Sequence, residues 1–256
     1  MTDSISQMAE EWFGIKTDPD DVKKLQAYLI RTYNSEDSDV LKKVFSSGEA
    51  AGFLTVNETY FFREPAHFTF LRNLLPFFEK KGINICSAAV STGCEAYSIA
   101  MLIEIYNKSL KEPIPYHIDA FDINHRVIET ACKGVYGQRA MREDGSCFHY
   151  LANPYLKKTT DGYQVDISLQ KNICFFVHNL MNDLPREKYD LIFFRNTFIY
   201  FSAPSRERVL SNLSSALKEE GTLIMGVSET AAVNHADLDE KNKNDVFYFQ
   251  KRGASS

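Results

Sequence analysis

A strand-turn-helix pattern in the first half of the chain has the residue types needed to hold a nucleotide-like cofactor. Apolar residues at 83–89 are followed by the small-residue turn Ser91-Thr92-Gly93, and helical spacing resumes over 95–106. Such a turn places backbone N–H groups at a helix start beside a cleft, where α/β proteins bind nucleotide-like ligands. The turn contains one glycine, so it differs from the Gly-x-Gly-x-x-Gly pattern of dinucleotide-binding proteins.

Two acidic residues near this turn could contact such a ligand. Asp122 ends the next apolar segment, at a point where a carboxylate accepts hydrogen bonds from ribose hydroxyls in doubly wound folds. An acidic residue at a strand end also caps the following helix, so both interpretations stay open. Glu95 has a similar alternative, because a glutamate in the first turn of a helix complements the helix dipole without touching a ligand.

A second candidate group follows the apolar segment 189–194. Arg195 and Asn196 would lie where a central strand opens into a ligand crevice, or would simply leave the core and become solvated. Tyr200, together with the phenylalanine after it, could equally be part of the apolar core. Upstream, residues 57–64 (NETYFFRE) combine polar residues with three aromatic ones and an arginine, and this pattern alone also fits a linker helix.

The elements that must position these residues alternate from residue 83 onward. This alternation predicts an α/β fold with a mostly parallel sheet and helices on both faces. The expected strands are 83–89, 116–123, 172–178, 189–194, 221–227 and 245–250, and the expected helices are 95–106, 126–133 and 205–218. Thr160-Asp161-Gly162 lies between two alternating segments, which predicts a small antiparallel hairpin insertion at about 142–172.

The first 56 residues form a separate, helical region in this prediction. Val22, Leu25, Tyr28 and Leu29 share one face of a helix, and Asp18-Pro19 is a typical helix start. The region has six Lys and Arg against ten Asp and Glu, so it contains most of the excess negative charge of the chain. We therefore expect an N-terminal helical domain and linker at 1–56 and a ligand-binding domain at 57–256.

Composition excludes several functional classes. The net charge of −5 over 256 residues disfavours a nucleic-acid-binding protein, because phosphate binding needs clusters of Lys and Arg. The chain has no run of 18 apolar residues and no basic N-terminal segment before an apolar one, so neither membrane insertion nor secretion is expected. Five cysteines without a Cys-x-x-Cys pair indicate reduced thiols in a cytoplasmic protein and no metal site.

Four motifs, in this order, resemble the chemotaxis receptor methyltransferases (CheR family): LTVNETYFFREPAHF, SAAVSTGCEAYSIAM, DINHRVIETACKGVY and YDLIFFRNTFIYFS. The resemblance runs from about residue 54 to residue 250. It implies a class I methyltransferase-like, doubly wound sheet of seven mostly parallel strands, with the hairpin as an antiparallel β-subdomain and an all-α N-terminal domain. It also implies S-adenosylmethionine-dependent methylation of glutamate side chains of chemoreceptors, which yields methyl esters and S-adenosylhomocysteine.

The resemblance assigns roles to individual residues. Glu95 would pair with the ammonium group of the cofactor, Asp122 would hold the ribose hydroxyls, and Asn179 with Leu180 would flank the adenine. The implied cofactor-binding residues are Asn57, Thr59, Arg63, Glu95, Asp122, Asn179, Leu180, Asn196 and Thr197. Arg63 and Tyr200 are the implied catalytic residues, and no metal is involved.

The chain departs from the family pattern at three places. Cys94-Glu95-Ala96 replaces the usual Glu-Glu-Pro, and Cys94 could be a redox-sensitive thiol or, as is commoner for cytosolic cysteines, a neutral packing residue. The N-terminal region is acidic where the family often has a basic helix for the receptor. The loop 157–163 lacks the Gly-x-Gly of members that bind a C-terminal receptor peptide, so the expected partner is the cytoplasmic domain of a receptor without that tether. Nothing implies an oligomer.

The alternative to an enzyme is a non-catalytic S-adenosylmethionine-binding module that regulates a protein partner. Arg63 and Tyr200 favour the enzyme, because a module that only binds the cofactor has less need of both residues. A nucleic-acid methyltransferase is disfavoured by the net charge and by the absence of a base-stacking motif such as NPPY.

Overall fold

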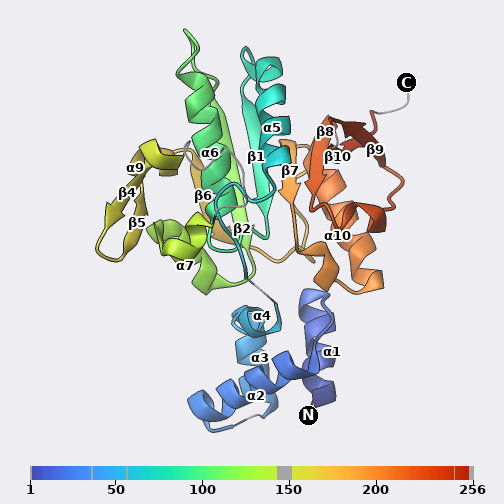
Figure 1. Cartoon of the computed structure of the whole chain (residues 1–256). Coiled ribbons are helices and arrows are strands. Elements are labelled where there is room, and N and C mark those ends of the chain that lie inside the picture. The colour runs from blue at the N-terminus through green and yellow to red at the C-terminus, as the bar shows by residue number, and fades with distance from the viewer. Residues whose placement is uncertain (1, 36, 56, 143–151, 245, 254–256) are drawn as a thin grey trace.

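A seven-stranded sheet forms the centre of the molecule (Figure 1). The structure is a computed structural model, and it describes residues 2–35, 37–55, 57–142, 152–244 and 246–253. The strand order is β6-β2-β1-β7-β8-β10-β9. The strands are β1 (Ile83–Ala88), β2 (Tyr116–Asp122), β6 (Ile173–Val177), β7 (Tyr189–Phe194), β8 (Leu217–Met225), β9 (Leu238–Lys243) and β10 (Val246–Lys251).

Most of the sheet is parallel. β6, β2, β1, β7 and β8 pair in parallel, whereas β10 is antiparallel to both β8 and β9. Parallel strands need helical crossovers, which cover both faces and leave central strands such as β7 buried almost throughout. The class I methyltransferase-like fold expected from the resemblance is confirmed.

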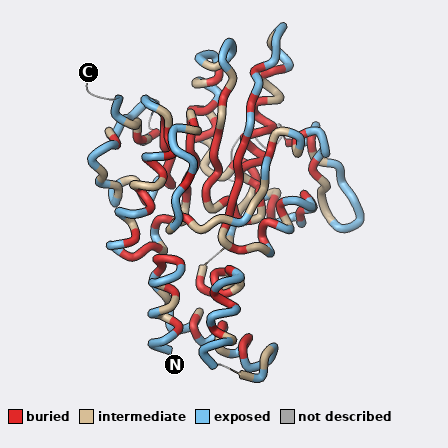
Figure 2. Tube along the Cα trace, turned by 180° about the vertical axis from the view of Figure 1, so that it is seen from behind, coloured by how far each residue is buried: buried red, intermediate tan, exposed pale blue. Residues whose placement is uncertain are grey.

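Helices on the two faces of the sheet bury two separate apolar clusters. The helices that follow residue 57 are α5 (Pro65–Leu74), α6 (Cys94–Asn107), α7 (His125–Lys133), α9 (Ile167–Gln170) and α10 (Ala203–Ala216). Phe193 belongs to the cluster under α5 and α6, and the next residue, Phe194, belongs to the cluster under α10. This alternation follows from the two-residue period of a strand, and Figure 2 shows the buried residues concentrated in the sheet.

The N-terminal helices lie below the carboxyl ends of the parallel strands in Figure 1. They are α1 (Thr2–Phe13), α2 (Pro19–Tyr33), α3 (Ser38–Ser46) and α4 (Ala51–Leu54). The predicted helix start is confirmed, because the side chain of Asp18 accepts a hydrogen bond from the backbone N–H of Asp20 at 2.8 Å. Their apolar residues join the α10-side cluster of the sheet. The boundary at residue 56 itself stays a prediction.

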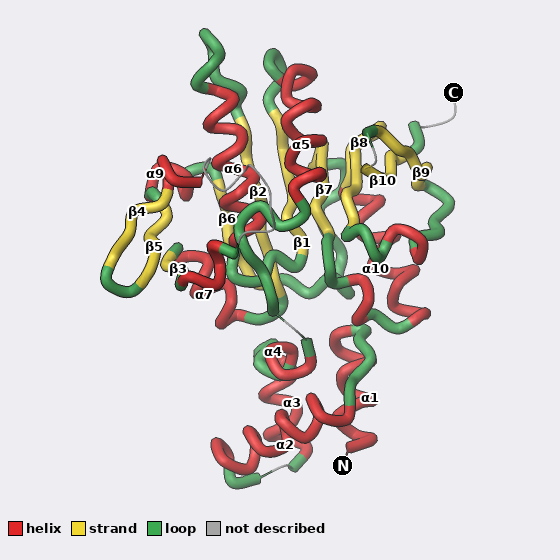
Figure 3. Tube along the Cα trace, in the orientation of Figure 1, coloured by secondary structure: helices red, strands yellow, loops and turns green. Residues whose placement is uncertain are grey.

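The structure adds strands that sequence patterns did not predict. β9 was missed because its sequence, LDEKNK, is almost entirely polar, and only pairing with β10 makes it a strand. The predicted hairpin is present as β4 (Leu156–Thr159) and β5 (Gly162–Val165), and β3 (Val135–Tyr136) adds a third strand upstream of the predicted insertion (Figure 3). Residues 143–151 of that insertion, and residue 245 of the last predicted strand, lie outside the described residues.

In the part of the chain that the structure describes, every helix is too short or too polar to span a membrane.

Candidate functional site

A cavity of about 270 Å³ lies at the carboxyl ends of the parallel strands, and we call it the site cavity. All ten residues that the resemblance singles out line it: Asn57, Thr59, Arg63, Glu95, Asp122, Asn179, Leu180, Asn196, Thr197 and Tyr200. They follow β1, β2, β6 and β7 or precede α5, because parallel strands bring these loops to one edge of the sheet. The structure therefore brings the predicted set together, while their individual roles stay predictions.

The turn before α6 needs glycine at one position. Gly93 has a φ of +90°, and a Cβ atom there would lie 2.8 Å from the Cβ of Ala131, so both conformation and space exclude a side chain. Ser91 also has a positive φ of 54°. Its backbone N–H donates to Asp122 at 2.9 Å and its hydroxyl donates to the carbonyl of Asn57 at 3.2 Å. The turn is thus tied to two other walls of the site cavity.

Asp122 is buried and does not cap the next helix. Its Oδ1 accepts from the backbone N–H of Asn124 at 3.0 Å, and its Oδ2 accepts from Ser91. Asn124 is the residue that caps α7, through a 3.0 Å bond from the N–H of Arg126. Burial raises the pKa of Asp122. Each carboxylate oxygen can accept a further hydrogen bond, so the group has capacity for a ligand in the site cavity.

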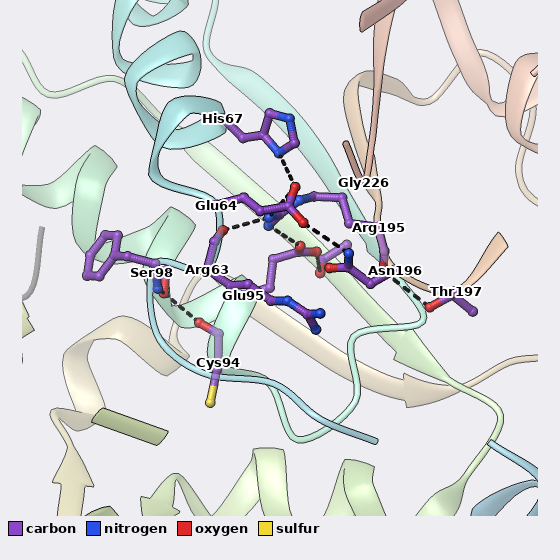
Figure 4. Close-up of polar contacts among 12 residues, drawn as sticks. Arg63, Glu64, His67, Cys94, Glu95, Ser98, Arg195, Asn196, Thr197 and Gly226 are labelled. Atoms are coloured by element: carbon purple, nitrogen blue, oxygen red, sulfur yellow. Dashed lines mark hydrogen bonds and ion pairs between the residues drawn. The ribbon is translucent and has the colours of Figure 1, made fainter. Parts of the chain in front are cut away.

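Glu95 has two side-chain partners, so complementing the helix dipole does not account for its position. Its Oε1 accepts from the hydroxyl of Ser87 at 2.7 Å. Its Oε2 accepts from Nη1 of Arg195 at 2.9 Å (Figure 4). Ser87 is on β1 and Arg195 follows β7, so two neighbouring strands hold the carboxylate from one side. The geometry orients Glu95 at the start of α6 along the wall of the site cavity.

Arg195 is buried rather than solvated, so that interpretation of its sequence position was wrong. Only 2 % of its side chain is exposed. Besides Glu95, its Nη2 donates to the backbone carbonyl of Arg63 at 2.6 Å and lies 3.2 Å from Oε2 of Glu64 (Figure 4). Arg195 lines the site cavity, as its place directly after a buried strand allowed, although the resemblance assigned it no role.

Glu64 is a further residue that the sequence analysis missed. Its backbone has a positive φ of 59° at the start of α5, and its Oε1 accepts from Nδ2 of Asn196 at 3.0 Å. Burial raises the pKa of Glu64, but Arg195 and Asn196 lower it overall. His67 lies beside it, with Nδ1 3.2 Å from Oε2 of Glu64. Burial, and then Arg195, lower the pKa of His67 to about 3, so the ring is neutral.

Glu229 shapes the loop that follows β7, and no sequence pattern indicated it. Its carboxylate accepts from the backbone N–H groups of Asn196 at 2.7 Å, Gly226 at 3.0 Å and Ile199 at 3.3 Å. Asn196 has a positive φ of 58°, which these bonds help to hold. Only 1 % of Glu229 is exposed, and burial raises its pKa.

Arg63 and Tyr200 lie on the wall of the site cavity. Nη1 of Arg63 donates to the carbonyl of Glu58 at 2.8 Å, and the guanidinium lies 5.7 Å from the ring centre of Tyr60. The segment that contains these residues is not a linker helix: residues 57–64 form turns and extended chain, with positive φ at two positions. Tyr200 ends a short 3₁₀ helix after β7.

The N-terminal helices contribute to the same cavity. Phe13 and Ile15 line it, although the sequence analysis assigned every site residue to 57–256. Nδ2 of Asn179 donates to the carbonyl of Trp12 at 2.6 Å, and the N–H of Lys16 donates to the carbonyl of Tyr200 at 2.8 Å. The end of α1 is therefore bonded to loops on two sides of the site cavity.

Cys94 has the character of a packing residue rather than of a reactive thiol. It is fully buried, and burial raises its pKa to about 12. Because the thiolate is the form that oxidises and attacks electrophiles, a thiol with this pKa is unreactive near neutral pH.

Known proteins resemble this chain over most of its length. The family model described as CheR methyltransferase, SAM binding domain, matches residues 57–247. The chemotaxis protein methyltransferase of Borreliella burgdorferi is 36% identical over 71% of this chain and 67% of its own length. The protein of the same name in Vibrio parahaemolyticus is 34% identical over 75% of this chain and 74% of its own length.

A third relative is named as a methyltransferase of a different process. The probable biofilm formation methyltransferase WspC of Pseudomonas aeruginosa is 31% identical over 78% of this chain, which covers about half of WspC (49%). The family model and the relatives agree with the site geometry, and we conclude that the chain belongs to the CheR methyltransferase family.

Proposed function

We propose that the site cavity is where this chain performs the reaction of its family, S-adenosylmethionine-dependent methyl transfer to glutamate side chains of a chemoreceptor. One observation carries the proposal: the residues of four separate sequence motifs line a single cavity at the carboxyl edge of the sheet. The products are a glutamate methyl ester and S-adenosylhomocysteine. Arg63 and Tyr200, which a module that only binds the cofactor would not need, line this cavity too.

The donor groups of the site cavity fit S-adenosylmethionine. Glu95 offers a carboxylate for the ammonium group of the amino acid end, and Asp122 offers acceptor capacity for the ribose hydroxyls. Leu180 and Phe121 supply apolar wall for the adenine. Asn179 would act through its backbone, because its side chain already bonds the carbonyl of Trp12 and the N–H of Met181.

Arg63 and Tyr200 would receive the methyl acceptor. A guanidinium has five N–H donors in a planar fork, which matches a carboxylate, and the hydrogen bond from Arg63 to Glu58 uses one of them. Tyr200 can add a hydrogen bond from its hydroxyl. The other implied residues on the wall of the site cavity are Asn57, Thr59, Asn196 and Thr197.

The reaction makes modest chemical demands on these residues. A glutamate side chain has a reference pKa of about 4.3, so the acceptor is ionised near neutral pH and needs no general base. The bound cofactor supplies a methyl group on a sulfonium, which is already activated. Alignment of the acceptor and exclusion of water remain for the protein, and they can supply roughly 7–11 kcal/mol in favourable cases.

We further propose that the receptor needs no C-terminal tether peptide. The β4–β5 hairpin closes through the two residues Thr160 and Asp161, without a Gly-x-Gly loop. A receptor cytoplasmic fragment should therefore be methylated at the same rate with and without its C-terminal tail. A strong dependence on the tail would contradict this part of the proposal.

The test of the function is methyl incorporation from labelled S-adenosylmethionine into cytoplasmic domains of chemoreceptors. We expect base-labile label in at least one receptor, as glutamate methyl esters release their methyl group in base. Calorimetry with the cofactor alone should show binding. Cofactor binding without ester formation in any receptor would support a regulatory module instead.

A further inference from the structure

A buried guanidinium joins two segments of the site cavity, the start of α6 with Glu95 and the segment before α5 with Arg63. Arg195 follows β7, Glu95 is in the first turn of α6, and Arg63 with Glu64 precedes α5. One nitrogen of the Arg195 fork, Nη1, binds Glu95 at 2.9 Å, and the other, Nη2, binds the carbonyl of Arg63 at 2.6 Å. Figure 4 shows Glu95 and the Arg63-Glu64 segment meeting at Arg195.

The charges around Arg195 do not cancel. Two carboxylates, Glu64 and Glu95, share this single guanidinium, and His67 is neutral. Glu229 approaches from the loop after β8, and its carboxylate binds backbone N–H groups rather than a cation. Arg63 directs its own guanidinium toward the carbonyl of Glu58. The cluster therefore has an excess of negative charge beside the site cavity, which suits a cationic ligand group.

We propose that Arg195 is the positioning residue that holds the carboxylate of Glu95 and the backbone of Arg63 in one rigid frame. Glu95 would bind the ammonium group of the cofactor, and Arg63 would bind the methyl acceptor. The frame keeps these two residues at a fixed distance from each other. The inference rests on the proposed function. A planar fork can bind both partners at once, whereas the single ammonium group of a lysine cannot reproduce that geometry.

The first test replaces the planar guanidinium of Arg195 with the ammonium group of lysine, which has the same charge. We expect Arg195→Lys to weaken S-adenosylmethionine binding by about tenfold, the effect of one lost charge-assisted hydrogen bond. At saturating cofactor, we expect turnover to fall by a further factor of about ten or more, because the Arg63 backbone is no longer held. Arg206→Lys is the matched control: Arg206 packs on the ring of Phe198 and does not line the site cavity, so both quantities should stay within about twofold.

The second test removes the charge. In Arg195→Gln, Glu64 and Glu95 lose their shared cation, and two buried carboxylates without a cation take up a proton more readily. We expect the affinity for S-adenosylmethionine to fall as the pH is lowered from 8 to 6, measured by calorimetry. The parent protein and Arg195→Lys should show no such dependence. A residue with only a structural role would not create a pH dependence of binding.

The outcomes separate this inference from the proposed function. Variants with unchanged affinity, turnover and pH profile would overturn it. So would circular dichroism showing that neither variant folds, because Arg195 would then act in folding alone. If the parent protein binds S-adenosylmethionine but methylates no receptor, the proposed function fails, and the two binding measurements still decide whether Arg195 positions Glu95.

Discussion

The two sides of the site cavity are held by different interactions. We call the side around Asp122 and Asn179 the ribose side, after the role proposed for Asp122, and its side chains bond to backbone groups of neighbouring loops. We call the side around Arg63 and Arg195 the transfer side, after the role proposed for Arg63, and there the buried guanidinium of Arg195 pairs with the carboxylates of Glu64 and Glu95. Both sides lie at the same edge of one sheet, so the difference comes from the side chains and not from the fold.

This difference predicts how far the effect of a substitution extends on each side of the site cavity. A buried ion pair that loses one partner leaves the other uncompensated, so changes on the transfer side spread to their neighbours. A side chain bonded to backbone amides can be replaced with a more local effect. We therefore expect ribose-side variants to change mainly cofactor affinity and transfer-side variants to change turnover, with a loss of affinity as well where the carboxylate of Glu95 is released, as in Arg195→Lys.

The largest expected effect is that of Arg63→Ala. Turnover should fall by about 10²–10³-fold, as for the loss of one transition-state donor, and this loss should exceed the loss of cofactor affinity that the second implied role of Arg63 predicts. Steady-state kinetics with labelled cofactor measure both. Arg142→Ala is the control, because Arg142 also contacts Tyr60 and Glu58 but does not line the site cavity. A wild-type rate of methyl transfer in Arg63→Ala would show that Arg63 has no part in the mechanism. It would also contradict the distinction between the two sides.

Asp122→Asn tests the ribose side. An amide cannot replace a carboxylate that accepts from both ribose and backbone, so S-adenosylmethionine affinity should fall by about 10–100-fold, the range for a lost charged hydrogen bond. Turnover at saturating cofactor should be largely kept. Asp166→Asn, at the N-cap of α9 away from the site cavity, controls for the substitution itself. A loss of turnover with intact affinity would show that the two sides are not separable.

Tyr200→Phe should have a smaller effect on the transfer side. Removal of one neutral hydrogen bond to the acceptor predicts about a 2–10-fold slower turnover and unchanged cofactor binding. Single-turnover kinetics measure the transfer step directly. Equal single-turnover rates in the two proteins would assign Tyr200 to the apolar wall alone.

His67 gives the smallest and most indirect test, through folding stability. Its pKa is lowered by burial to about 3, so the unfolded chain takes up the proton first and stability is lost as the pH falls below about 6.5. Between pH 7 and pH 5 this residue should account for about 2 kcal/mol of that loss. In urea unfolding, the free energy of unfolding of His67→Asn should decrease less between pH 7 and pH 5 than that of the parent protein. His125→Gln should show the same decrease as the parent protein.

Much of the fold could be predicted from local pattern. The apolar segments at 83–89 and 189–194 correspond to β1 and β7, and the Asp-Gly signal marked the β4–β5 hairpin. β9 could not be predicted, because a polar edge strand has no pattern of its own and forms only against β10. The extra strand β3 has only two residues, too few for any periodicity.

Eight of the ten predicted site residues lie in the four motifs, Asn179 and Leu180 came from the family resemblance, and the structure brings all ten to one cavity. The residues that hold them there could not be found in the same way. Glu229 has no pattern that sets it apart from surface glutamates, and Glu64 lies in the first motif, where the resemblance assigned it no role. The contributions of Phe13 and Ile15 depend on where α1 packs.

The sequence by itself determined the alternation of strands and helices, the glycine in the turn before α6 and the chemistry of the residues around the site cavity, because each depends on near neighbours in the chain. Only the tertiary structure decided that Arg195 is buried between Glu95 and the carbonyl of Arg63, and that α1 closes the ribose side. Those contacts join residues about a hundred or more positions apart, and their energy exists only once the sheet has formed.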